Sequence, residues 1–91
     1  MVAREFQKRS QKFFVEDEFR EKLFEMAYKK EGSLRRLGRK LGYTGSAPNY
    51  YVNRMWCGKQ LISLEQLKIL SEITNISLKE ILDHTEIKKK L

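Results

Sequence analysis

One stretch of the chain, residues 32–64, carries positive charge and no carboxylate. All 12 Asp and Glu residues lie outside it, although charged residues make up 34% of the sequence. The cations of this stretch are Arg35, Arg36, Arg39, Lys40, Arg54 and Lys59. Guanidinium and ammonium groups bind phosphate and carboxylate oxygens, and neighbouring acids would compete for them. The stretch therefore indicates a surface that meets a polyanion.

The composition favours the same kind of partner. The net charge is +7 at pH 7 and the pI is about 9.7, which alone does not distinguish DNA, RNA, acidic lipid or acidic protein. A chain of 91 residues makes one small domain. The single cysteine, Cys57, excludes an internal disulfide, and no signal-peptide-like or membrane-spanning apolar run occurs. We expect a cytoplasmic protein that does not contact membranes.

The sequence lacks the patterns of catalytic and metal sites. It has no paired-carboxylate motif, no nucleophile beside a base and no Gly-rich phosphate loop. Cys57 and His84 are the only residues of their types, so neither has a partner at metal-ligand spacing. We expect a packed thiol at Cys57 and a surface residue at His84. The predicted protein is not an enzyme and uses no cofactor or metal.

The apolar spacing predicts helices throughout, because β-branched residues never alternate with polar ones over the length of a strand. The expected helices cover residues 17–30, 34–41, 47–57, 63–73 and 77–83. The predicted fold is an all-α, compact bundle of about five helices. We divide the chain into a basic N-terminal arm or helix (1–16), the helical domain (17–84) and a basic C-terminal tail (85–91).

Residues at the helix starts support this division. Ser63 with Gln66, and Ser77 with Glu80, form capping boxes at the starts of the last two helices. Ser46 is a candidate N-cap for the third helix. The buried stripe of the first helix is predicted to be Phe19, Leu23, Met26 and Ala27.

Several other positions suggest specific packing. Gly38 costs a helix about 1 kcal/mol relative to alanine, which favours close approach of another helix over a merely tolerated weak position. Of Tyr50 and Tyr51, we expect one to be buried and the other exposed. Trp56 is predicted to anchor the core or a loop.

The motif order resembles the helix-turn-helix of the lambda-repressor/Cro type. The first half of that motif matches at Ser33, Leu37, Gly38, Leu41, Gly42 and Tyr43. The recognition helix, the Gly-Lys loop and the fourth helix are matched by Val52, Met55, Gly58, Lys59, Ser63, Leu64, Leu67, Ile69 and Leu70. The closing helix is matched by residues 76–82, so the resemblance covers roughly residues 19–82.

The chain departs from that family at three places. The segment between Gly42 and Gly58 is longer by about four residues, which we place in the turn at residues 44–47. Leu34 stands where the family has a phosphate-binding Gln. Trp56-Cys57 replaces the usual Glu-Asn before the loop glycine, and Ile62 replaces the loop proline.

The resemblance implies that helix 47–57 enters the major groove while the preceding helix crosses the backbone. The implied base contacts are Asn49, Tyr50, Asn53 and Arg54. The implied phosphate contacts are Arg35, Arg36, Arg39, Lys40 and Lys59, with Lys8 and Arg9 from the arm. Double-stranded DNA is then the expected partner of a transcription regulator. A homodimer would form through residues 78–87.

Two other functions fit the sequence. The basic arm and the enlarged turn are also compatible with RNA binding, or with a DNA-targeting module of a larger machine, and RNA binding predicts that RNA competes better than duplex DNA. A protein-interaction adaptor of the same fold predicts weak DNA binding with a shallow salt dependence. The individual residues also have plainer interpretations: Arg35 and Arg36 form an ordinary solvated helix face, and Arg54 pairs with a neighbouring carboxylate.

Overall fold

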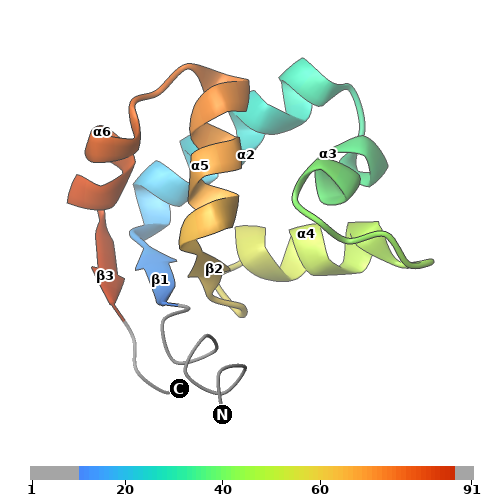
Figure 1. Cartoon of the computed structure of the whole chain (residues 1–91), viewed down its shortest axis with the longest axis horizontal. Helices are drawn as coiled ribbons and strands as arrows, with labels where there is room; N and C mark the ends of the chain where they lie inside the picture. Colours follow the sequence, from blue (N-terminus) through green and yellow to red (C-terminus); the bar gives the residue numbers. More distant parts are fainter. Residues whose placement is uncertain (1–10, 88–91) are drawn as a thin grey trace, which may run out of the picture.

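The computed structural model describes residues 11–87, and the structural statements below refer to this part of the chain. Its elements in chain order are β1 (Lys12–Val15), α2 (Asp17–Glu31), α3 (Leu34–Lys40), α4 (Pro48–Trp56), β2 (Ile62–Ser63), α5 (Leu64–Thr74), α6 (Leu78–Asp83) and β3 (Thr85–Ile87) (Figure 1). The helices lie where the apolar spacing predicts them. Each ends close to its expected boundary.

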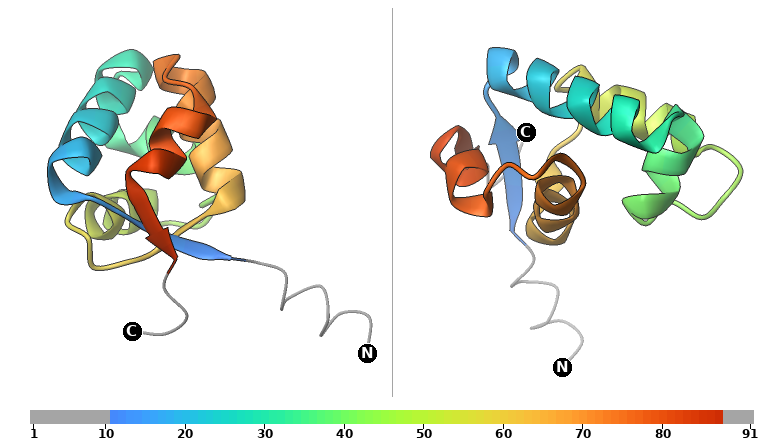
Figure 2. Two further views of the ribbon diagram at one scale, coloured as in Figure 1. Left: turned by 90° about the vertical axis from the view of Figure 1, so that its left-hand side faces the viewer. Right: turned by 90° about the horizontal axis from the view of Figure 1, so that it is seen from above.

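The prediction of an all-α fold is wrong, because the two ends of the helical region pair as strands. A three-stranded antiparallel sheet has the order β2-β1-β3, and Phe13 pairs with Ile62 on one side and with Ile87 on the other. The central strand comes from the predicted arm or helix, and the edge strand β3 comes from the predicted tail. Figure 2 shows β1 and β3 crossing beneath the helices. The strands have four, two and three residues, too few for alternation to be recognised.

The hydrophobic core lies between the helices and the sheet. Its buried apolar residues are Phe13, Val15, Leu23, Phe24, Ala27, Leu37, Leu41, Val52, Met55, Ile62, Leu67, Leu70 and Ile81. Phe24, which the sequence analysis does not select, replaces Met26 in the buried stripe of α2, and Met26 is 40% exposed. The buried residues of α2 follow i, i+3, i+4, i+7 spacing from Arg20. A pattern of apolar residues does not include Arg20, because Arg20 is charged. Trp56 packs against this core, as predicted.

Arg20 is a buried cation that fastens three elements together. It is 7% exposed, and its guanidinium donates hydrogen bonds to the backbone oxygens of Val15 (2.7 Å) and Trp56 (2.8 Å). It also pairs with the exposed carboxylate of Asp17 at 3.0 Å. The space for it depends on Gly58, where an added Cβ would lie 2.9 Å from the guanidinium carbon. Arg20 thus joins β1, α2 and the end of α4.

The helix starts agree with prediction at two serines and differ at a third. The capping box at Ser63 is complete, whereas at Ser77 only the serine half of the predicted box forms, with the Ser77 hydroxyl accepting a hydrogen bond from the backbone N–H of Glu80. Ser46 is not an N-cap. Helix α4 begins after Ala47, whose side chain cannot accept a hydrogen bond, and Pro48 occupies the first helical position, where its missing N–H leaves one donor fewer to satisfy.

Candidate nucleic-acid interface

Helices α3 and α4 meet at a contact that only a glycine allows. A Cβ added to Gly38 would lie 2.6 Å from the Cβ of Pro48 and 2.8 Å from its backbone oxygen. Both distances are shorter than real Cβ contacts, so the prediction of close packing at Gly38 is confirmed. This contact sets the spacing between the two helices that form the candidate interface (Figure 1).

Helix α4 buries one side and presents the other to solvent. Val52 and Met55 are buried, as predicted. The outer side carries the four residues that the resemblance selects for base contacts: Asn49, Tyr50, Asn53 and Arg54. At 3.6 residues per turn, these four side chains leave the helix within an arc of about 140°. The fold therefore brings them together on one face.

The tyrosines of α4 are both exposed, which corrects the expectation that one is buried. Tyr50 is 56% exposed and Tyr51 37%. Tyr51 stacks on Tyr43, with ring centroids 4.5 Å apart and planes at 7°, and Tyr50 meets Tyr51 edge-on at 5.2 Å. The hydroxyl of Tyr43 accepts hydrogen bonds from the side-chain amides of Gln60 (2.8 Å) and Gln66 (3.1 Å).

Arg54 is half-buried and held by two contacts. Its guanidinium donates a hydrogen bond to the backbone oxygen of Lys59 (3.1 Å) and lies 5.7 Å from the centroid of the Tyr50 ring. Within residues 11–87 no carboxylate forms an ion pair with it, so the alternative interpretation of Arg54 does not apply to this part of the chain. A guanidinium has five N–H donors, and most of them are left for a ligand.

The cations of α3 are exposed, but one of them is paired with an acid. Lys40 Nζ lies 3.6 Å from the carboxylate of Glu31, which is only 15% exposed. An open hollow of about 510 Å³ is lined by Glu31, Arg36, Arg39 and Lys40. The turn at Gly32, with φ of +90°, brings the last residue of α2 against the end of α3. The stretch that is free of acids in sequence is therefore not free of them in space.

The remaining predicted phosphate contacts divide into two groups. Arg35 and Lys59 are exposed, at the start of α3 and in the loop after α4. Lys8 and Arg9 lie outside the described residues.

If this surface binds duplex DNA, we expect Glu31→Gln to raise the affinity about two- to fivefold at low salt. The change frees the Lys40 ammonium from its carboxylate and adds close to one effective positive charge to the surface. The salt dependence of binding will steepen accordingly, by somewhat less than one in the log–log slope. Glu25→Gln is the matched control, because Glu25 pairs with Lys29 on the exposed side of α2. Equal affinities for the two variants would show that the hollow does not face the phosphates.

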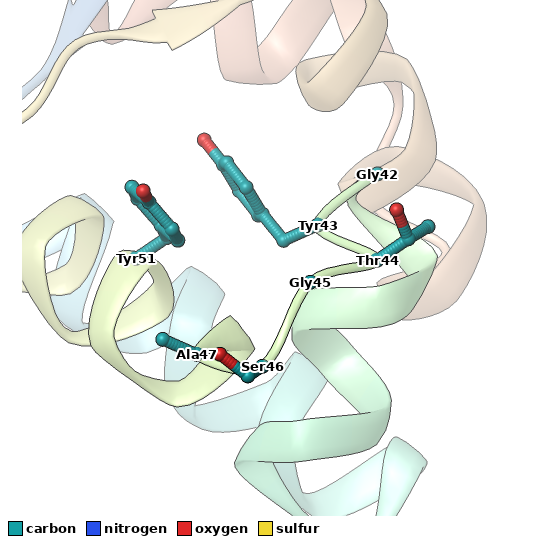
Figure 3. Close-up of a pocket in the computed structure, with 7 residues that line it drawn as sticks. All are labelled: Gly42, Tyr43, Thr44, Gly45, Ser46, Ala47 and Tyr51. Carbon is teal, nitrogen blue, oxygen red and sulfur yellow. The ribbon is translucent and has the colours of Figure 1, made fainter.

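The turn between α3 and α4, residues 42–47, lines a second hollow on this surface. Gly42, Tyr43, Thr44, Gly45, Ser46, Ala47 and Tyr51 line an open hollow of about 400 Å³ (Figure 3). The hollow itself could not be predicted from the sequence of this turn. The sequence feature that points to the hollow is the pair Tyr43 and Tyr51, one in the turn and one in the following helix. Their stacking depends on how the turn bends.

Other kinds of site are not apparent in the described part of the chain. Between residues 11 and 87, no group of three or more His, Cys, Asp or Glu side chains could hold a metal ion. In the same range, no helix is both long enough and apolar enough to cross a membrane. Cys57 is exposed rather than packed, and His84 contacts Glu16 (3.1 Å) and stacks on Phe19 (4.2 Å).

Comparisons of the chain with models of protein families, with curated proteins and with solved structures gave no match. The function is therefore inferred from the geometry and chemistry of the surface formed by α3, α4 and the turn between them.

Proposed function

We propose that this protein binds double-stranded DNA, with α4 in the major groove and α3 against the sugar–phosphate backbone. The observation that carries the proposal is the outer face of α4, which presents Asn49, Tyr50, Asn53 and Arg54 and belongs to a helix packed directly on α3, whose cations are exposed. A major groove about 12 Å wide admits one helix. The resemblance to the lambda-repressor/Cro helix-turn-helix supports the same placement.

The side chains of α4 suit purine edges. An asparagine amide can form two hydrogen bonds with adenine, and an arginine guanidinium two with guanine. Asn49 and Asn53 are exposed, and within residues 11–87 no protein group hydrogen-bonds to either amide. Their donors and acceptors are therefore available to a ligand, as are the remaining donors of Arg54.

The surrounding cations suit phosphates. Arg35, Arg36 and Arg39 are exposed, and none forms an ion pair within the described part of the chain. Lys59 is also exposed, while Lys40 is partly neutralised by Glu31. These groups would position α4 without reading sequence.

The combination of amides with cations supports a role in sequence-specific transcription regulation, and the single cysteine favours a cytoplasmic location. A homodimer of such a protein would recognise half-sites about 34–36 Å apart, as in other dimeric helix-turn-helix proteins.

The test is duplex binding as a function of salt, followed by selection from a random-sequence pool. Four to five cations at the backbone give an expected log–log slope of about −3.6 to −4.5. An enriched motif would establish sequence reading, and a palindrome would indicate a dimer. A steep slope without a motif would favour architectural or RNA-directed binding. No binding at modest salt would favour the adaptor function.

The double substitution Asn53→Ala with Arg54→Ala will weaken binding to the selected site about 30-fold or more. Each lost bidentate contact removes about 1–3 kcal/mol of discrimination, whereas the phosphate contacts that support non-specific binding stay. Affinity for random duplex should therefore change much less, and competition anisotropy with both duplexes measures the ratio. Lys68→Ala, an exposed change on α5, is the control for charge. An unchanged ratio would exclude α4 as the reading helix.

A further inference from the structure

Four side chains form a continuous row of contacts, which we call the tyrosine ladder: Tyr43 stacks on Tyr51, Tyr51 meets Tyr50 edge-on, and the Arg54 guanidinium lies over the Tyr50 ring. Tyrosine rings of this kind are large apolar surfaces, and the two rings on α4 are substantially exposed to water. Exposed aromatic faces beside cations are the usual components of a surface on which nucleobases stack.

Tyr43, at one end of the tyrosine ladder, is held in position by hydrogen bonds. Gln66 donates hydrogen bonds to the Tyr43 hydroxyl and to the backbone oxygen of Leu41 (both 3.1 Å), and its side-chain oxygen accepts from the Ser63 N–H. The same glutamine thus completes the cap of α5 and orients Tyr43. A ring held in this way loses little conformational freedom when a ligand stacks against its neighbour, which favours binding.

The hollow beside the ladder has the polarity of a base-binding site. None of the residues that line it is charged, and the side chains of Tyr43 and Tyr51 form one side of it (Figure 3). Thr44 and Ser46 contribute hydroxyls, and the turn contributes backbone groups. Such a lining suits a neutral aromatic heterocycle, whereas the nearby cations suit the phosphates that flank it.

We infer that the ladder and the turn at residues 42–47 receive one unpaired nucleobase. The preferred target is then a duplex with an unpaired nucleotide next to the site read by α4. This inference rests on the proposed nucleic-acid binding and specifies its substrate. It also assigns a role to the turn residues, because residues 42–47 line the hollow.

The experiment uses the full chain and DNA duplexes with 2-aminopurine, whose fluorescence falls when it stacks on an aromatic ring. One duplex carries the analogue as a single bulged nucleotide, and the other carries it paired. We expect the bulged duplex to bind about tenfold or more tightly and its fluorescence to be quenched, since one base–aromatic stack contributes about that factor. Tyr51→Leu should abolish both the preference and the quenching, while Tyr51→Phe should retain them.

Three results would overturn the inference in distinguishable ways. Equal affinity for bulged and paired duplexes excludes base stacking and leaves the proposed DNA binding intact. Equal affinity for an abasic bulge and a bulged base shows that the protein selects a flexible backbone. Failure to bind any of the duplexes removes both proposals. The same bulged duplex is also made of RNA. Tighter binding of the RNA duplex with equal quenching would support the site for an unpaired base and would identify RNA as the nucleic acid that supplies this base.

Discussion

Substituting Gly38→Ala will lower the free energy of unfolding by about 1–2 kcal/mol and, if the protein binds DNA as proposed, will weaken sequence-specific binding. The new Cβ would lie 2.6 Å from the Cβ of Pro48 and 2.8 Å from its backbone oxygen. Proline and backbone cannot rotate away, so α4 must move, and such overpacking exceeds the gain of about 1 kcal/mol in helix propensity. Urea unfolding followed by circular dichroism measures the change in stability.

Gly45→Ala is the matched control for this prediction. Nothing lies within 4 Å of a Cβ added at Gly45, and its φ is not in the left-handed region. Its stability should change by less than about 0.5 kcal/mol, as for other open surface positions. Equal stability of the two variants would mean that the helices separate at no cost and that the contact at Pro48 does not set their spacing.

Substituting Arg20→Met will lower the free energy of unfolding by about 3–5 kcal/mol. Methionine fills much of the same volume, but the backbone oxygens of Val15 and Trp56 then lose their donors inside the protein. Each unsatisfied buried carbonyl costs about 1–3 kcal/mol. Trp56 is the only tryptophan, so its fluorescence reports the loosening of the end of α4 directly.

Asp17→Asn separates the ion pair from these hydrogen bonds. The Asp17 side chain is 80% exposed, and an exposed ion pair contributes at most about 1 kcal/mol. The carbonyl groups, rather than the carboxylate, should therefore account for most of the effect at Arg20. A loss of stability at Asp17→Asn as large as that at Arg20→Met would assign the role to the ion pair instead.

Helix positions could be predicted from the sequence because helices depend on local signals. The capping serines and the apolar spacing of α5 and α6 act over a few residues, and the structure follows them closely. The stripe of α2 was only partly predictable, because Arg20 occupies a core position that a hydrophobic pattern does not select. Its burial depends on carbonyl oxygens supplied by distant segments.

The sheet could not be predicted from local patterns. The buried residues Phe13 and Val15 alternate with the less buried Lys12 and Phe14. An alternation over only four residues is too short to distinguish a strand from a helix. The strand exists because Ile62 and residues 85–87 supply hydrogen bonds from far along the chain. A single sequence does not reveal such pairing.

The candidate interface was predictable in its parts but not in its arrangement. The outward position of Asn49, Asn53 and Arg54 follows from helical periodicity once the inward residues are known. The proximity of Glu31 to Lys40 and the stacking of tyrosines across the turn depend on how two bends orient their flanking helices. Those bends are set by tertiary packing, not by the residues in them alone.

The order of the strands has a consequence for synthesis of the chain on the ribosome. Within residues 11–87, β1 is made before every helix, yet one of its two partners, β3, is made after all of them. The backbone N–H and C=O groups of residues 12–15 that face β3 therefore have no strand partner until residues 85–87 have left the ribosome. Closing a loop of this length carries the entropic cost of a non-local contact, and such contacts form late. The nascent domain should accordingly exist as a helical intermediate with an open strand edge, and it should reach full resistance to proteases only when β3 is free to pair.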